Sequence, residues 1–148
     1  MSRKRRFEVL LRVAEAREQD AARALADGRT ALQESHDKLE QLLLYRADYG
    51  KDLTNQGRVG LGVQIQNHWL FLERLNSAIT EQRQELHQLG HALEATKRRW
   101  QDTHRQLSVL GRFAERVREA DRTENDKRSQ KFVDDLAGAA HVRQSRKN

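Results

Sequence analysis

The sequence contains no cysteine and no proline, and only 5% of its 148 residues are aromatic. Without cysteine the chain can form neither disulfides nor thiolate metal sites, and its composition is compatible with a reducing compartment. Without proline nothing in the chain must break a helix. Hydrophobic residues make up 36% and charged residues 34%. A compact domain of this length would be more apolar, and this composition is typical of a long helix or coiled coil.

Long apolar runs are also missing, because no stretch approaches the roughly 20 apolar residues that span a bilayer. The basic N-terminus, Arg3 to Arg6, is followed by a segment that Glu8, Arg12 and Glu15 interrupt, so it is not expected to be a signal peptide. We therefore expect a cytoplasmic protein. The net charge of +6 permits contact with nucleic acid, anionic lipid or an acidic protein, and selects none of them.

Apolar residues recur in alternating steps of four and three along two segments, which we call the first and second ladders. The first ladder is Phe7, Leu11, Ala14, Glu18, Ala21, Leu25, Gly28, Leu32, Ser35, Leu39, Leu42, Arg46, Tyr49 and Leu53. The second ladder is Ile65, His68, Leu72, Leu75, Ile79, Gln82, Leu86, Leu89, Leu93, Thr96, Trp100, Thr103, Leu107, Leu110, Ala114 and Val117. A heptad pattern sustained this long indicates a coiled coil.

A glycine cluster separates the two ladders and predicts a turn, since Gly50, Gly57, Gly60 and Gly62 fall within thirteen residues. The predicted fold is all-α, a long antiparallel two-helix coiled-coil hairpin, because a short loop allows only antiparallel neighbours. Residues 1–148 form a single domain. Its helices cover about 5–53 and 63–121, its loop about 54–62, and a charged extension about 122–148 is either helical or ordered only on binding.

The loop length favours one register of the two helices, although a shift of one heptad also keeps the ladders in phase. In the favoured register two polar ladder residues face each other, and a small residue faces a large one. The expected pairs include Leu11 with Leu107, Leu25 with Leu93, Leu32 with Leu86, Ser35 with Gln82, and Gly28 with Leu89.

Two motifs resemble functional sites without completing one. His87 and His91 have the i, i+4 spacing of metal ligands and Glu94 is close, but a full ligand set is not in view, so we expect surface histidines. The glycines at 57, 60 and 62 lack the Gly-Lys-Ser/Thr of a phosphate loop. We expect no metal, no cofactor, no catalytic residues and therefore no enzyme.

Apolar residues lie off both ladders near the glycine cluster, at Leu43, Leu44 and Tyr45 and at residues 69–71 and Ala78. One interpretation is a broader helix–helix contact or a third helix folded over it. The other is an exposed patch that binds another protein. We favour the patch, because no third amphipathic helix is available to cover it.

The sequence resembles the FliJ family, small coiled-coil proteins of the flagellar type III export apparatus. Its opening segment, RFEVLLRVAEAREQDAARALA, is similar to the family's aromatic residue, Leu-rich turn and Glu/Arg/Ala helix. Lys38 and Gln82 depart from a family glutamine and a family histidine. The positions that match the family are Leu42, Tyr45 and Tyr49 on one helix, and Phe71, Leu75 and Ala78 on the facing helix.

The resemblance implies a non-enzymatic stalk, similar to the central stalk of rotary ATPases and located at the inner membrane of the flagellar base through its partners. The joined ends of the chain would insert into a hexameric export ATPase ring, the six matching positions would contact the cytoplasmic domain of the export gate, and the protein would escort export chaperones. The residues expected at the ring end are Phe7, Leu11, Leu107, Leu110 and Val117.

Three alternatives remain open. The equivalent stalk of a virulence secretion system has the same shape and class. A nucleic-acid-binding coiled coil would use the basic runs at Arg3–Arg6, Lys97–Arg99 and Arg143–Lys147, and its binding would fall steeply with salt. A holdase-like hairpin would bind unfolded proteins through the patch near the loop.

Overall fold

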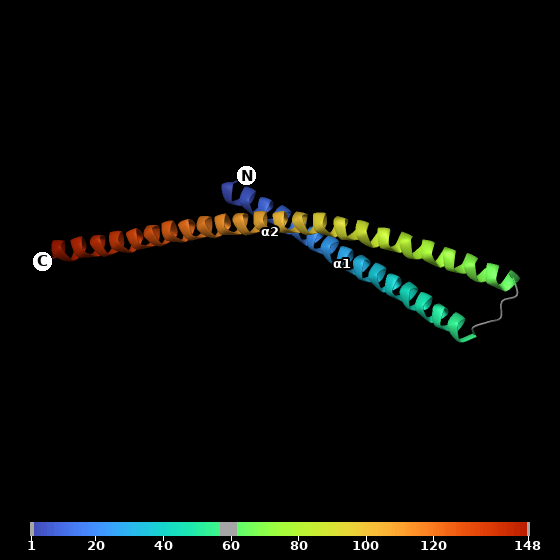
Figure 1. Cartoon of the computed structure of the whole chain (residues 1–148). Helices are drawn as coiled ribbons and strands as arrows, with labels where there is room; N and C mark the ends of the chain where they lie inside the picture. Colours follow the sequence, from blue (N-terminus) through green and yellow to red (C-terminus); the bar gives the residue numbers. More distant parts are fainter. Residues whose placement is uncertain (1, 57–61, 148) are drawn as a thin grey trace. The chain divides into compact units, whose positions relative to one another are not determined.

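A computed structural model of the protein describes residues 2–56 and 62–147, with the side chains of residues 2–52 and 66–146. These residues form two helices and no strand: α1 spans Arg3–Gln56 and α2 spans Gly62–Lys147 (Figure 1). The predicted all-α fold is therefore confirmed. The centre of the predicted loop, residues 57–61, lies outside the described part of the chain.

The N-terminus of α1 is capped by Ser2. The Arg5 amide donates a hydrogen bond to Ser2 Oγ at 3.3 Å, and the Arg6 amide donates one to the Ser2 carbonyl at 3.2 Å. A serine in this position satisfies amides that have no partner within the helix. At its other end α1 continues to Gln56, three residues past the predicted end near 53.

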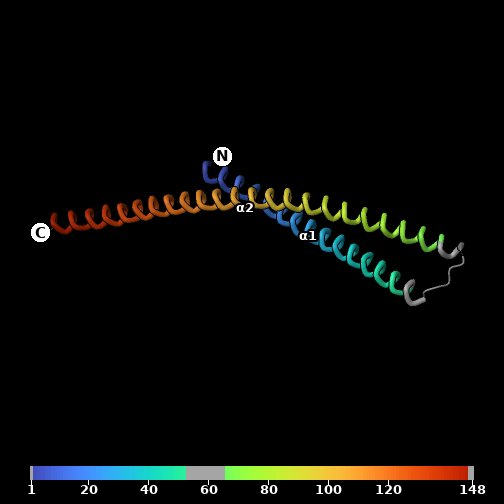
Figure 2. Tube along the Cα trace, viewed as in Figure 1, coloured from blue at the N-terminus to red at the C-terminus, as the bar shows by residue number. Residues whose placement is uncertain are grey.

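α2 continues past the predicted end near residue 121 to Lys147, so the extension is helical, which is one of the two alternatives that the sequence left open (Figure 2). The segment 122–147 contains no proline, and Glu124 and Arg128 form an i, i+4 ion pair at 3.0 Å. The second ladder does not extend into this segment, and its largest apolar side chains are exposed: Phe132, Val133, Leu136 and Val142. Local helix propensity rather than packing against α1 therefore explains why the helix continues.

The helices pack against each other within two units. The terminal unit consists of Met1–Glu18 and Thr103–Asn148, and the central unit consists of Gln19–Asp102. In the central unit Tyr49 of α1 contacts Phe71 of α2, and in the terminal unit Phe7 of α1 contacts Phe113. Within the central unit Ser35 pairs with Gln82 and the later Tyr49 with the earlier Phe71, and within the terminal unit Phe7 pairs with Phe113 and the later Glu18 with the earlier His104. The pairing is therefore antiparallel in each unit. That the whole chain is one domain remains a prediction.

The two ladders form the contact between the helices. Every ladder residue whose side chain is described is buried or half-buried, and the buried apolar residues all belong to the ladders. Ile79 is the most enclosed, with 1% of its surface exposed. In heptad notation the ladders are the a and d positions. The buried apolar residues are Ala14, Ala21, Leu25, Leu75 and Ile79.

One polar layer in the central unit fixes the register. Gln82 Nε2 donates hydrogen bonds to Ser35 Oγ at 2.8 Å and to the Ser35 carbonyl at 3.1 Å, and Ser35 is only 3% exposed. A slip of one heptad would move these groups about 10 Å apart, since each helical residue rises about 1.5 Å. The predicted pairing of Ser35 with Gln82 is confirmed, and it distinguishes this register from the shifted one.

Gly28 packs against Leu93 rather than Leu89, which the sequence placed opposite it. A Cβ atom at Gly28 would lie 3.1 Å from Leu93 Cδ1. Side chains on a helix lean toward its N-terminus, so a residue covers the turn that precedes its own backbone. Leu93 therefore fills the space that a count of backbone positions assigns to Leu89.

Gly28 and Gly90 should respond differently to replacement by alanine. A Cβ at Gly90 would meet nothing within 4 Å, so Gly90→Ala should stabilise the protein by about 0.5–1 kcal/mol through helix propensity. Gly28→Ala gains the same propensity, but Leu93 must shift to accept the methyl group, so we expect a smaller gain or none. Urea unfolding followed by circular dichroism measures both. Equal gains at the two sites would contradict the close Gly28–Leu93 contact.

Candidate protein-binding surfaces

Each helix has two flanks beside its ladder. The g flank contains the residues immediately before ladder positions (heptad g and c), and the e flank contains those immediately after them (e and b). Tyr45 of α1 and Phe71 of α2 are both g residues, and their rings meet edge to face with centroids 5.8 Å apart. The g flanks of the two helices therefore lie on the same side of the pair, as expected for antiparallel helices.

An aromatic cluster joins α1 and α2 in the central unit. Besides its contact with Tyr45, Phe71 packs against Tyr49 with ring centroids 4.7 Å apart. Tyr49 also packs on His68, at a centroid distance of 5.4 Å, and its hydroxyl shares a hydrogen bond with His68 Nδ1. Tyr49 and Phe71 are half-buried, whereas Tyr45 is 55% exposed. Tyr45 thus lies at the exposed end of the cluster and is supported by Phe71.

The six residues that the family resemblance assigned to the export gate differ in accessibility. Leu75 is buried, with 7% of its surface exposed, so it supports the surface from below. Tyr45 is exposed, and the other four are half-buried: Leu42, Tyr49, Phe71 and Ala78. We call the three g-flank residues among the six, Tyr45, Phe71 and Ala78, the tyrosine face.

A shallow groove borders the tyrosine face. Its lining joins Leu42 and Tyr45 to polar residues from both helices: Lys38, Gln41 and Gln82. Lys38 and Gln82 are the two positions that depart from the family pattern. Gln82 is occupied with the Ser35 hydrogen bonds, so its amide orientation is set by the polar layer. Lys38 is exposed and adds a positive charge at the rim.

The off-ladder apolar residues do not form one patch. Trp69 precedes Phe71 by two residues, a rotation of about 200° around the helix, so the two point to opposite sides. Trp69 lies on the e flank, where Arg46 Nη1 donates a 3.1 Å hydrogen bond to Asn76 Oδ1. Leu44 and Leu70 are both more than half exposed at outward positions. The predicted single surface is therefore divided between two flanks.

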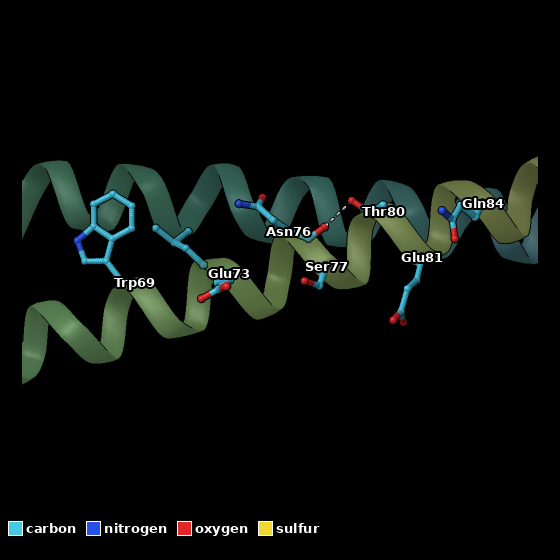
Figure 3. Close-up of a pocket in the computed structure, with 8 residues that line it drawn as sticks. Trp69, Glu73, Asn76, Ser77, Thr80, Glu81 and Gln84 are labelled. Carbon is cyan, nitrogen blue, oxygen red and sulfur yellow. Dashed lines mark hydrogen bonds between the residues drawn. The ribbon is translucent and has the colours of Figure 1, made fainter.

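An open groove runs along α2 from Trp69 to Gln84 (Figure 3). Its polar lining includes Asn76 and Thr80, whose hydroxyl donates a 3.0 Å hydrogen bond to the Asn76 carbonyl within the helix. Glu73 and Glu81 stand at its edge, exposed to solvent. No nucleophile paired with a base is present among these lining residues, so the groove offers no chemistry of the kind that a catalytic site requires.

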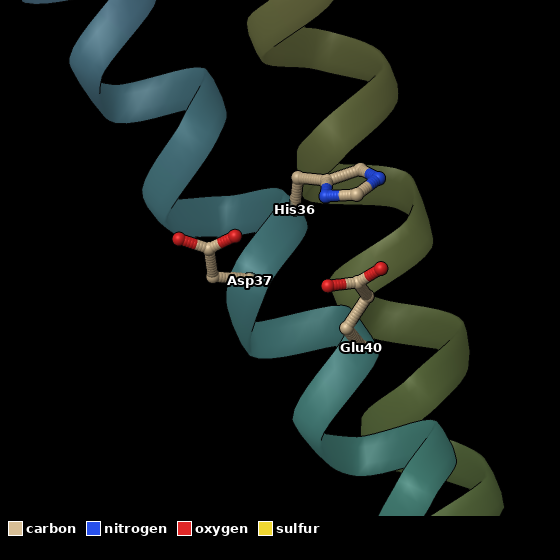
Figure 4. A group of neighbouring side chains, drawn as sticks. All are labelled: His36, Asp37 and Glu40. Atoms are coloured by element: carbon tan, nitrogen blue, oxygen red, sulfur yellow. The ribbon is translucent and has the colours of Figure 1, made fainter.

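Three exposed side chains of α1, His36, Asp37 and Glu40, hold ligand-type atoms within 4.8 Å of one another (Figure 4). Asp37 accepts a 3.0 Å hydrogen bond from Gln33 Nε2. Neighbouring polar residues on one helix surface produce such groups without any ion, and nothing encloses this one. We assign it no function.

His87 and His91, the pair that the sequence singled out, have their Nε2 atoms 3.2 Å apart and their ring centroids 4.6 Å apart. A hydrogen bond between one protonated and one unprotonated ring nitrogen accounts for this contact. Glu94 lines the same shallow groove with Arg83, but its carboxylate does not group with the two histidines among the described residues. The pair supplies two ligands, which is fewer than a zinc site uses.

The residues expected at the ring end pack inside the terminal unit. All five are half-buried, and Phe7 touches Phe113 with ring centroids 6.4 Å apart: Phe7, Leu11, Leu107, Leu110 and Val117. Sequence reasoning missed four exposed apolar residues on the g flank beside them, namely Leu10, Val13, Val109 and Phe113; Val9 is also exposed but lies at an outward position. Each of these four residues comes immediately before a ladder residue, and this shared position was the signal that could have identified them.

Within residues 2–56 and 62–147, neither helix has a stretch long and apolar enough to cross a membrane.

Comparison with known proteins agrees with this geometry. The model of the FliJ family, described as "Flagellar FliJ protein", matches residues 3–146. The chain is 27% identical over 135 residues to a flagellar FliJ protein of Escherichia coli K12, covering 88% of this chain and 90% of that protein. A flagellar FliJ protein of Salmonella typhi is 26% identical over 141 residues, covering 93% and 94%. The chain therefore belongs to the FliJ family of flagellar proteins and is a component of the flagellar export apparatus.

Proposed function

We propose that the protein is a non-enzymatic stalk of the export apparatus, which links a hexameric export ATPase ring to the membrane export gate and escorts export chaperones. Two long helices that pack against each other through their ladder residues could transmit force between two partners. The grooves of the described residues are open and lack the converging acid, base and nucleophile that catalysis needs. The protein would act on the cytoplasmic side of the inner membrane at the flagellar base, where its partners hold it.

The tyrosine face is the proposed contact with the cytoplasmic domain of the export gate. The observation that carries this assignment is the cluster of Tyr45, Tyr49 and Phe71, in which the half-buried Phe71 packs on Tyr49 and contacts the exposed Tyr45. Tyrosine is a frequent hot-spot residue because it gives a large, stiff contact area and a polar tip. Leu42 and Ala78 widen the surface, and Leu75 supports it from within.

The terminal unit is the proposed contact with the ATPase ring. Its packed residues Phe7, Leu11, Leu107, Leu110 and Val117 hold α1 and α2 together there, which gives the ring a two-helix end to grip. ATP hydrolysis in the ring would then change how the stalk engages the gate. A virulence secretion stalk would have the same surfaces, and the ATPase that co-purifies with the chain distinguishes the two.

Replacing Tyr45 by alanine tests the gate contact. We expect Tyr45→Ala to weaken binding to the purified cytoplasmic domain of the export gate at least tenfold, because hot-spot aromatic residues contribute about 2 kcal/mol or more. Leu44→Ala is the matched control: Leu44 is the adjacent residue, is 65% exposed and points away from the tyrosine face. Isothermal titration calorimetry measures the affinity, and circular dichroism checks helicity. Binding that is unchanged by Tyr45→Ala would refute this surface.

A further inference from the structure

The terminal unit carries an exposed apolar surface that the helix contact does not use. Leu10 and Val13 of α1 are 53% and 43% exposed, and Val109 and Phe113 of α2 are 46% and 49% exposed. We call these four residues the Leu10 face. A group of large, half-exposed apolar side chains on a protein surface often marks an interaction site.

The four residues lie on one side of the helix pair. Phe113 reaches across to Phe7, as their 6.4 Å ring separation shows. Leu10 follows Phe7 by three residues and Val13 follows Leu10 by three, so both lie near Phe7 along one flank of α1. Val109 precedes Phe113 by four residues, one turn away on α2. All four are g-flank residues, as Tyr45 and Phe71 are in the central unit.

The rim of the Leu10 face is basic. Eight residues come immediately before ladder positions from Phe7 to Glu18 and from Leu107 to Val117, and none of them is acidic. They are the four of the Leu10 face together with Arg6, Arg17, Gln106 and Arg116. The guanidinium of Arg116 lies 5.9 Å from the centre of the Phe113 ring. By contrast, the e flank of the same unit includes Glu8, Glu15 and Glu115.

Charge is distributed unequally between the two units. The terminal unit holds seventeen Lys and Arg against ten Asp and Glu, a net charge of +7, whereas the central unit holds eleven against twelve, a net charge of −1. The positive charge of the whole chain thus comes entirely from the unit that bears the Leu10 face.

The first turn of α1 contributes positive charge, although this charge destabilises the start of the helix. Residues 3–6 are all basic, and the turn contains no acidic residue. The N-terminus of a helix carries partial positive charge, so cations there are unfavourable. Where a sequence breaks such a local rule, function is a common reason. A partner that supplies negative charge would remove this repulsion.

We propose that the Leu10 face docks into an acidic protein surface, where an apolar groove takes Leu10 and Phe113 and carboxylates around it pair with Arg6, Arg17 and Arg116. The inference rests on the proposed function, because it names the residues and the partner chemistry of the contact at the terminal unit. In the ATPase ring it predicts a pore lined by apolar residues with acidic residues beside them. The packed ladder residues Phe7 and Leu110 shape the surface from beneath.

The observations favour a protein over nucleic acid. The arginines could contact a phosphate backbone, but the four apolar side chains would have no role there, since phosphate and sugar take half to two-thirds of all protein–DNA hydrogen bonds. Neither does the surface suit a lipid bilayer, because four half-exposed apolar side chains offer much less area than the continuous apolar face with which an interfacial helix enters a membrane. Duplex DNA and anionic vesicles are therefore competing occupants in the test.

The test measures binding of the full-length chain to the purified export ATPase by surface plasmon resonance. The variant Leu10→Ser with Phe113→Ser should bind at least tenfold more weakly and keep its circular dichroism spectrum. The matched control is Leu70→Ser, a comparably exposed leucine at 52% in the central unit, which should bind as the original chain does. The variant Arg6→Gln with Arg116→Gln should lower the salt dependence of binding as well as the affinity.

Each outcome has a distinct meaning. If the original chain binds the ATPase and the Leu10/Phe113 variant binds equally well, the Leu10 face is wrong and the proposed function stands. Loss of binding caused by Phe132→Ser instead would move the contact to the unpaired end of α2 and overturn the inference. Should the original chain not bind the ATPase at all, the ring assignment and the inference fall together. Tighter binding to a 20-base-pair duplex or to phosphatidylglycerol vesicles, insensitive to the Leu10/Phe113 variant, would also overturn it.

Discussion

Replacing Ile79 by alanine should destabilise the protein by about 2–5 kcal/mol, the usual cost of truncating a buried isoleucine. Ile79 is the largest fully buried side chain, at 1% exposed, and it lies in the middle of the α1–α2 contact of the central unit. The ladders provide one layer of packing, so few neighbours can move to fill the space that Ile79 leaves. Alanine's higher helix propensity offsets only a few tenths of a kcal/mol of this loss.

Urea unfolding followed by circular dichroism measures the effect, with Leu70→Ala as the matched control. Leu70 is on the same helix and 52% exposed, so its truncation should change stability by less than about 1 kcal/mol. If Ile79→Ala and Leu70→Ala lower the free energy of unfolding equally, the second ladder does not face α1 as described.

Replacing the polar layer by apolar residues should raise stability and remove the register preference. In the variant Ser35→Ala with Gln82→Leu, the two hydrogen bonds between α1 and α2 disappear and a leucine enters the ladder. Burying leucine contributes about 1.5–3 kcal/mol and the two lost hydrogen bonds about 1 kcal/mol each, so the expected gain is at most about 1 kcal/mol. A polar pair at one ladder layer nevertheless fixes register, because the slipped state leaves both groups without partners.

We expect this variant to unfold at higher urea while populating more than one register. Introduced cysteine pairs report the register cleanly, since the chain has no cysteine of its own. In the variant background a pair that matches the native register and a pair shifted by one heptad should both form disulfides. If only the native pair forms, register is fixed by some other feature, such as the Gly28–Leu93 contact or the length of the connection.

The fold could be predicted well from the sequence because a coiled coil is encoded by one feature, the heptad repeat of its apolar residues. Each ladder residue from Phe7 to Tyr49 and from His68 to Val117 is buried or half-buried. The pairing of Ser35 with Gln82 followed from counting along both helices from the turn. The end of α2 was not predicted, because beyond Val117 the helix is not marked by packing, and helix propensity alone does not define a boundary.

The surfaces were predicted less completely than the fold. Apolar residues near the turn were recognised as off the ladders, but Tyr45 and Phe71 share a flank and Trp69 does not, which depends on rotation around the helix rather than on distance along it. The Leu10 face went unnoticed because its residues are ordinary leucine, valine and phenylalanine among many. The Leu10 face is identified by two features together: its residues come immediately before ladder residues, and the g-flank residues around them are not acidic.

The common feature of the two proposed surfaces is that α1 and α2 each contribute half. Tyr45 needs Phe71 beside it, and Leu10 needs Phe113. Register is therefore a functional requirement as well as a structural one, since a slip of one heptad would separate the halves of both surfaces by about 10 Å.

A disulfide measurement on the central unit tests this register most directly. Leu32→Cys with Leu86→Cys should form an intramolecular disulfide rapidly under mild oxidation, while Leu32→Cys with Leu93→Cys should remain reduced in the monomer, because bridged Cα atoms must lie about 4.4–6.8 Å apart. We expect only the first pair to form a disulfide within one chain. Preferential bridging of Leu32→Cys with Leu93→Cys, or bridges only between chains, would contradict it.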